Sequence, residues 1–134
     1  MNLMQTIHQR WAADETLDGL LPASRVSTGI NVDPASPYAV IGTRGNRPIG
    51  YHNDGSVLVT VGVRIQVFDE AYDAAAAIVA QVKATFDRTD FDLSGDDRVV
   101  NMQRTDDRAR QEDDGTWQWV VDFDCTVYLG LVKE

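Results

Sequence analysis

The sequence has little cysteine and no long apolar run. Its single cysteine, Cys125, cannot form a disulfide within the chain, so a reducing compartment is expected. No apolar stretch approaches the roughly 20 residues that a membrane-spanning helix needs. Residues 1–15 lack the basic start, apolar core and cleavage site of a signal peptide. These absences predict a protein that is neither secreted nor embedded in a membrane.

Basic residues are also scarce. The chain has 12 Lys and Arg residues against 21 Asp and Glu residues, which gives a net charge of −9. Residues 1–67 are balanced, with five acids and five bases, whereas residues 68–134 hold sixteen acids and seven bases. Such an acidic surface repels the phosphate backbone of nucleic acids. Sequence-specific nucleic-acid binding is therefore not expected.

A length of 134 residues favours a single domain over residues 1–134, and no linker, internal repeat or low-complexity segment divides the chain. Spacing of apolar residues, capping residues and turn signals together predict eight elements. In chain order they are a helix around Leu3, Ile7 and Trp11, a short helix capped by Asp14 and ended by Pro22, strands over 24–30, 37–43 and 56–68, a helix over 72–86 capped by Asp69, and strands over 98–105 and 116–131.

In two of the predicted strands, apolar residues at odd positions alternate with mostly polar residues at even positions. Every odd residue from Val57 to Val67 is apolar, and so is every odd residue from Trp117 to Leu129. Such alternation is typical of an antiparallel sheet with one buried face. We therefore expect an α+β fold of order α-α-β-β-β-α-β-β, with a mainly antiparallel sheet covered by helices on one face.

Residues 44–56, RGNRPIGYHNDGS, are polar and rich in glycine. They are predicted to form a loop between two strands, and this loop is longer than the two to five residues usual for a hairpin. Residues 106–115 are similarly expected to form a charged turn between the last two strands. Long loops in small domains often carry a function, so the first of these segments is a candidate site.

One segment resembles the start of a calcium-binding loop. Asp90, Asp92 and Ser94 occupy positions 1, 3 and 5 of such a loop, and Gly95 occupies position 6. The bidentate glutamate required at position 12 is replaced by Asn101. An acidic turn is therefore favoured over a calcium site.

Residues suited to catalysis are few and scattered. His8, His52 and Cys125 lie far apart in the sequence and make a weak case for zinc, which needs three or four such ligands. Cys125 lies on the apolar side of its strand, as a buried structural cysteine does. Neither a nucleophile elbow nor a phosphate-binding loop is present. We expect no enzyme activity, no catalytic residue, no metal and no cofactor.

Three motifs carry a resemblance to a known family. They are LDGLLPASRV at 17–26, PYAVI at 37–41 and VGVRIQVFDEAYDAAAAIVAQVKATF at 61–86. Their order resembles that of the tail terminator, or tail completion, proteins of long-tailed bacteriophages. The resemblance covers residues 3–90 and contains no catalytic signature.

The resemblance implies a small α+β subunit in a homo-oligomeric ring, usually a hexamer. The ring would cap the tail tube, end its polymerisation and join it to the head connector. The implied partners are further copies of the chain, the tail tube protein and the connector protein, and the implied location is the neck of the virion, after assembly in the host cytoplasm. Two alternatives stay open, namely another head–tail joining or head-completion protein, and a small non-viral α+β binding domain.

The candidate interface follows from charge. Arginine and tyrosine are enriched in protein interfaces, and arginine binds carboxylates with two parallel hydrogen bonds. We therefore expect the segment at 44–56 to reach the acidic half of a neighbouring subunit or the tail tube. The residues proposed for this contact are Arg44, Arg47, Tyr51, His52 and Asn53.

Overall fold

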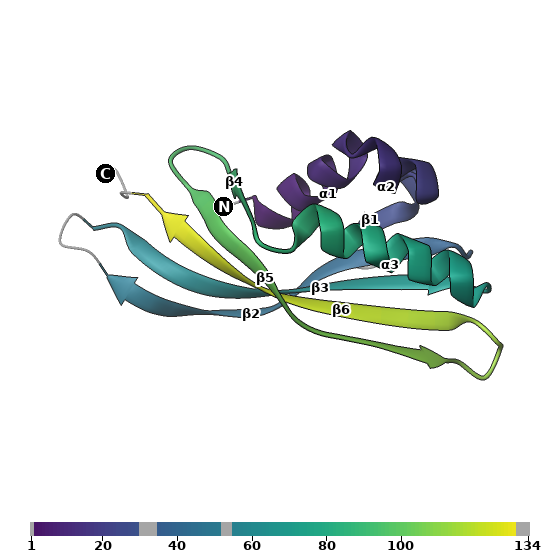
Figure 1. The fold of residues 1–134 in the computed structure, drawn as a ribbon. Helices are drawn as coiled ribbons and strands as arrows, with labels where there is room; N and C mark the ends of the chain where they lie inside the picture. The colour runs from purple at the N-terminus through teal and green to yellow at the C-terminus, as the bar shows by residue number, and fades with distance from the viewer. Residues whose placement is uncertain (1, 30–34, 52–54, 131–134) are drawn as a thin grey trace.

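The computed structural model describes residues 2–29, 35–51 and 55–130 and shows three helices packed on one face of a six-stranded sheet (Figure 1). The elements in chain order are α1 (Leu3–Ala13), α2 (Glu15–Leu20), a 3₁₀ turn (Ala23–Arg25), β1 (Val26–Thr28), β2 (Tyr38–Tyr51), β3 (Val57–Asp69), α3 (Tyr72–Phe86), β4 (Thr89–Asp92), β5 (Arg98–Gln111) and β6 (Trp117–Leu129).

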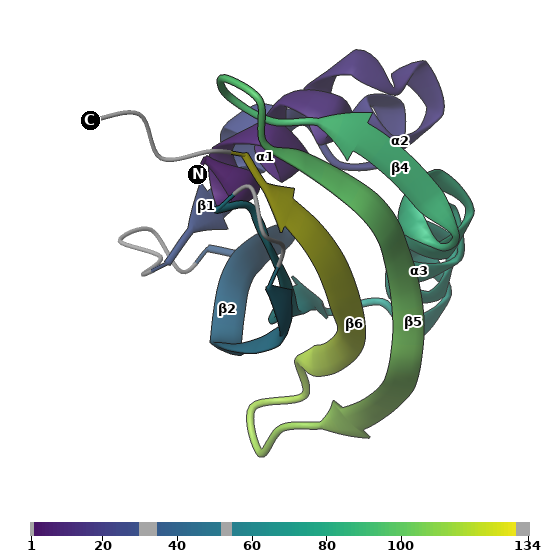
Figure 2. The same cartoon turned by 90° about the vertical axis from the view of Figure 1, so that its left-hand side faces the viewer.

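The strands lie in the spatial order β1-β2-β3-β6-β5-β4, and the sheet is curled (Figure 2). All neighbouring strands are antiparallel except β1 and β2, which are parallel. The sheet is therefore mixed, where the sequence predicted a mainly antiparallel one. The expected element order also lacks β4, a four-residue edge strand too short to show a periodic pattern of its own.

The predicted alternation is confirmed for β3, whereas in β6 a run of four buried residues, Val120–Phe123, interrupts it. The odd residues Val59 to Val67 of β3 are buried, and their even neighbours are partly exposed. In the register of β3 with β6, Val61 pairs with Cys125 and Val63 pairs with Phe123, so paired residues share one face. This face lies beneath the helices, as expected.

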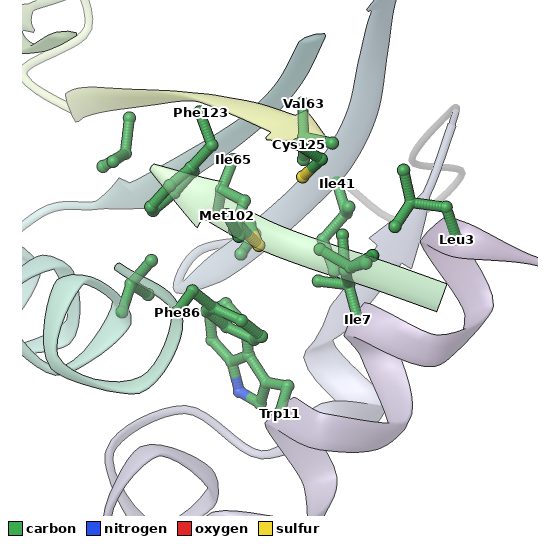
Figure 3. Close-up of a cluster of buried hydrophobic side chains, with 14 of the residues drawn as sticks. Leu3, Ile7, Trp11, Ile41, Val63, Ile65, Phe86, Met102, Phe123 and Cys125 are labelled. Carbon is green, nitrogen blue, oxygen red and sulfur yellow. The ribbon is translucent and has the colours of Figure 1, made fainter. Parts of the chain in front are cut away.

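The core fills the space between the covered face and the helices (Figure 3). The helix α3 runs along this face and buries an apolar stripe that ends at Phe86. The helix α1 adds Leu3, Ile7 and Trp11 at four-residue spacing. Trp11 is fully buried, and its indole N–H donates to the carbonyl of Leu21 at 2.8 Å, which satisfies the polar atom of the largest core side chain.

Asp14 connects the two small helices to α3. Its carboxylate accepts a hydrogen bond from the backbone N–H of Leu17 at 2.9 Å and thereby caps α2, as predicted. Its other oxygen accepts from the hydroxyl of Thr85 on α3 at 2.8 Å. These two hydrogen bonds hold the pKa of Asp14 below its ordinary value.

Asp69 is not the N-cap that the sequence indicated. It is the last residue of β3, and Ala71 occupies the N-cap position of α3. The carboxylate of Asp69 instead accepts a hydrogen bond from the N–H of Ala71 at 2.9 Å. The side chain therefore stabilises the turn between β3 and α3 rather than the first turn of the helix itself.

The two segments predicted as loops are largely strand. β2 continues to Tyr51, so residues 44–51 pair with β3, and β5 continues to Gln111 beside β6. Bulges at Arg44 and Ile49 absorb the glycines and the proline of β2 without ending the pairing. The prediction was wrong because turn-forming composition was read locally, whereas the long apolar strand β3 supplies a partner along its full length.

None of the described helices combines the length and the apolar character that are needed to cross a membrane.

Candidate interaction surface

The second face of the sheet is not covered by any of the described elements (Figure 1). It is formed by the even residues of β3 and β6 and by their partners on β2 and β5. Over β2, β3, β6 and residues 103–111 of β5, this face carries five arginines and three aspartates, a charge of +2 in a chain of net charge −9. These residues are Arg44, Arg47, Arg64, Arg108, Arg110, Asp106, Asp122 and Asp124.

Asp122 lies at the centre of this uncovered face and is only 5% exposed. Arg64, directly opposite on β3, places its Nε 2.8 Å from Oδ1 of Asp122 and a terminal nitrogen 3.3 Å from Oδ2. Arg44 from β2 lies 3.5 Å from Oδ1, and Arg108 from β5 lies 3.4 Å from Oδ2. Three strands therefore direct guanidinium groups at one buried carboxylate.

The charge state of the cluster follows from these contacts. Burial raises the pKa of Asp122, but hydrogen bonds from Arg64 and the charges of Arg44 and Arg64 outweigh it, so the pKa lies below its ordinary value. The hydrogen bonds that Arg64 donates to Asp122 raise the pKa of Arg64. Arg44 and Arg108 each contact a second carboxylate as well, that of Asp124 and that of Asp106 respectively.

Two shallow hollows open on the uncovered face. The first has a volume of about 260 Å³ and is lined by Arg64, Gln66, Arg108, Ala109, Arg110, Gln118 and Val120. The second has a volume of about 400 Å³ and is lined by Arg44, Gly45, Arg47, Thr60, Gly62 and Asp124. Both present guanidinium groups around a small open space, which suits carboxylates of a partner better than a buried small molecule.

Arg44 and Arg47, which the sequence indicated as contact residues, line the same hollow. Arg44 also binds two acids of its own chain, since it lies 3.5 Å from Asp124 as well as from Asp122. Arg47 is exposed and has no ion-pair partner among the described residues. Tyr51 ends β2, while its side chain and the whole of His52 and Asn53 lie outside the part that the structure describes.

Sequence reasoning missed the centre of the cluster. Arg64, Arg108 and Asp122 are separated by up to 58 positions along the chain and converge only through strand pairing. The sequence offers a signal for two of them. Arg64 and Asp122 are charged residues at even positions of two strands whose odd positions are all apolar, which places both on the uncovered face. Arg108 gives no such signal, because the composition of residues 106–115 is typical of a charged turn.

Side chains considered for metal or nucleophilic chemistry have structural roles. The Nε2 atom of His8 lies 3.0 Å and 3.1 Å from the carbonyls of Ala23 and Val26, so it donates there and holds α1 against the start of β1. Cys125 is fully buried, and burial raises the pKa of its thiol to about 12. Within residues 2–29, 35–51 and 55–130, no three His, Cys, Asp or Glu side chains are grouped as metal ligands.

The segment resembling a calcium loop is a strand followed by a tight turn. Its two apolar residues, Phe91 and Leu93, are buried in the core, while Asp90 and Asp92 are exposed on the strand β4. The turn is closed by a hydrogen bond from the N–H of Leu93 to the carbonyl of Asp97 at 3.0 Å. The chain therefore does not wrap around a cation position as a calcium loop does.

Comparison with known proteins gives a family and a structural neighbour. The family described as "Tail completion protein gp17" matches residues 5–128. A chain of the structure titled "Virion of native gene transfer agent (GTA) particle" superposes with a TM-score of 0.73 at 18% identity, covering 92% of each chain. At this identity the superposition shows a shared fold. None of the curated proteins compared matches the sequence.

Proposed function

Because this chain belongs to the tail completion protein gp17 family, it is a structural protein of a virion tail, and we propose that it forms a ring that caps the tail tube. The ring ends polymerisation of the tube and provides the joint to the head connector. Its partners are further copies of the chain, usually six in total, together with the tail tube protein and the connector protein. The family match over residues 5–128 is the observation that carries this proposal.

The proposed role is mechanical, without catalysis. A ring subunit needs a stiff body and two different surfaces that meet between neighbours, since head-to-tail contacts close into a ring when the rotation divides the circle. A helix-covered sheet with pairing along 13 residues between β3 and β6 is consistent with such a body. The protonated, buried thiol of Cys125 is unsuited to nucleophilic attack, which is consistent with a non-enzymatic role.

We place one contact of this ring on the uncovered face, at the end of the β2–β3 hairpin. Arg44, Arg47, Tyr51, His52 and Asn53 are the residues proposed to meet a neighbouring subunit or the tail tube. The exposure of Arg47 and its lack of an ion-pair partner among the described residues support this placement. Arg44 contributes less freely, because Asp122 and Asp124 of its own chain already hold it.

The test uses cells that produce the virus-like particle to which this chain belongs. If the gene is omitted, electron microscopy is expected to show tails of excessive and irregular length that lack attached heads. Heads that fail to retain their DNA, together with tails of normal length, would instead favour a head-completion protein. The family match already speaks against a non-viral binding domain.

A point variant separates the contact from the fold. Arg47→Glu is expected to fold normally, since exposed substitutions usually change stability by less than about 0.5 kcal/mol. It is expected to reproduce the overlong tails in part or in full. Arg44→Glu is a poorer probe, because it places a third acid beside Asp122 and Asp124 and lowers the stability of the subunit. Normal tails with Arg47→Glu would exclude this residue from the contact.

A further inference from the structure

The end of the molecule opposite the β2–β3 hairpin combines acidic and aromatic side chains. The β5–β6 hairpin and the first turn of α3 lie together there (Figure 1). Residues 69–74 and 111–117 contain six acids and no base. Three aromatic residues, Tyr72, Trp117 and Trp119, lie among them, and we call the two segments with these aromatic residues the acidic end.

The aromatic residues form one packed group that stays partly open. The ring of Tyr72 lies 4.9 Å from that of Trp117 in an edge-on arrangement and 5.4 Å from that of Trp119. Tyr72 is 46% exposed, although tyrosine in a folded protein usually buries most of its ring. The indole nitrogen of Trp119 is buried without a hydrogen-bond partner among the described atoms. Tyrosine and tryptophan in such a setting are the residues most often found at the energetic centre of interfaces.

The hairpin tip beside this group is fixed by its own hydrogen bonds. The N–H of Glu112 donates to the carbonyl of Thr116 at 2.8 Å, and the N–H of Gly115 donates to the carbonyl of Glu112 at 2.9 Å. The carboxylate of Asp114 accepts from the N–H of Thr116 at 2.9 Å, and the hydrogen bonds from Thr116 hold its pKa below the ordinary value. The tip is therefore charged and ordered before any partner arrives, which lowers the entropic cost of binding.

Within one chain, the acidic end does not meet Arg44 and Arg47 of β2. Arg47 pairs with Thr60 of β3, whereas Trp117 pairs with Asp69 of β3. These two positions are nine residues apart on one strand, a separation of roughly 30 Å. Arg47 therefore reaches the carboxylates of the hairpin tip only in another copy, whereas Arg110 lines a hollow with Glu112, Asp113 and Asp114 of its own chain.

Strand pairing between copies is less suited to this contact than side chains are. β1 covers only Ala39–Ile41 of β2, and beyond that point no strand among the described residues pairs with the outer edge of β2. This edge is interrupted by two bulges and by Pro48, which has no N–H to donate. Residues 104–110 of β5 hold five charged side chains and a bulge. Both edges have the features with which natural sheets prevent edge-to-edge association.

We propose that the acidic end of one copy binds the arginine-bearing uncovered face of a second copy, head to tail. The carboxylates of the hairpin tip pair with Arg47 and Arg44 of the neighbour, and a guanidinium stacks on the open face of Tyr72. This inference rests on the proposed ring and names the second half of its subunit contact. Because the two surfaces differ, the contact is heterologous and closes into a ring rather than a symmetric dimer.

The experiment uses two full-length variants of opposite design, Arg47→Glu and the double variant Asp113→Arg/Asp114→Arg. Each variant alone brings like charges together at every contact, so each is expected to associate at least about 100-fold more weakly than the wild-type protein. In an equimolar mixture, every contact between unlike subunits again joins opposite charges. The mixture is therefore expected to assemble into alternating oligomers, measured by sedimentation velocity. The control variant Glu15→Arg/Asp90→Arg changes two exposed acids away from both surfaces and is expected to associate as the wild-type protein does.

Tryptophan fluorescence reports the same contact independently. Trp11 is fully buried and stays constant, while Trp117 and Trp119 are half-buried. Assembly is expected to shift their emission to shorter wavelength, and Tyr72→Ala is expected to weaken association by about tenfold without unfolding the chain.

Three results would overturn the inference. In the first, either variant alone associates as tightly as the wild-type protein. In the second, the mixture fails to assemble. In the third, the wild-type protein stays monomeric up to about 1 mM. The third result leaves the proposed function intact, because a tail tube is able to organise the ring on its surface. Conversely, tails of normal length in cells that lack the gene would contradict the proposed function, whether or not the mixture of variants assembles.

Discussion

The side chain of Arg44 on β2 crosses directly over Gly62 on β3. A Cβ atom at position 62 would lie 3.2 Å from Cβ of Arg44 and 3.3 Å from its guanidinium carbon. Glycine leaves the space through which Arg44 spans one strand and reaches Asp122 and Asp124 on the next. A residue without a side chain is therefore part of the ion-pair cluster on the uncovered face.

Substitution of Gly62 tests this relationship. Gly62→Val is expected to push Arg44 away from β6 and to lower the free energy of unfolding by about 1–2 kcal/mol, as overpacking does. The matched control is Gly42→Val, because a Cβ at position 42 meets no atom within 4 Å. Urea denaturation of both variants provides the measurement. Equal stability of the two variants would show that Arg44 is not confined by Gly62.

The low pKa of Asp122 makes stability depend on acid. Its folded-state pKa lies below the ordinary 3.8, so its contribution to stability is fully present well above pH 3.8 and is lost as the pH falls through the folded-state pKa. Asp122→Asn is expected to be less stable than the wild-type protein by about 1–3 kcal/mol at pH 7 and to lose less stability below about pH 4. Asp113→Asn, at an exposed position, is the control. Parallel stability curves for wild type and Asp122→Asn would contradict the assignment.

The covered face is tested by introducing charge. Val61 and Phe123 are 2% and 0% exposed, so Val61→Asp or Phe123→Asp places an unpaired carboxylate in the core. The expected cost exceeds about 4 kcal/mol and should prevent folding, as judged by circular dichroism and proteolysis. Thr60→Asp is the control, because Thr60 lies beside Arg47 on the uncovered face. A well-folded Val61→Asp protein would mean that the sheet faces are assigned the wrong way round.

Calcium is expected to have no effect on stability. Phe91 and Leu93 occupy the core, so Asp90 and Asp92 are not free to surround a cation together with the turn that follows. The thermal midpoint should therefore agree within about 1 °C in excess calcium and in chelator, because a ligand stabilises only the state that binds it. A thermal midpoint that rises with calcium in the wild-type protein but not in Asp92→Asn would show that this segment binds calcium.

Local pattern was sufficient for much of the fold. The apolar residues at the odd positions of β3 and β6 predict which face of each strand is buried, because a side chain changes face at every residue of a strand. The spacing of Leu3, Ile7 and Trp11 and the apolar stripe of α3 likewise predict two helices and the side of each that is buried. The motifs at 17–26, 37–41 and 61–86 also indicated the tail completion family, which the match over residues 5–128 confirms.

Pairing between distant strands decided the rest. Glycine and proline in residues 44–51 favour a loop when considered alone, yet β3 offers a continuous row of backbone partners and bulges absorb the misfit. The cluster around Asp122 depends on the register that sets Arg64 opposite it and brings Arg44 and Arg108 in from the flanking strands. The sequence alone determined which side chains face the core, because that depends on periodicity within a strand. Only the tertiary structure decided which charges meet on the other face, because that depends on register between strands far apart in the chain.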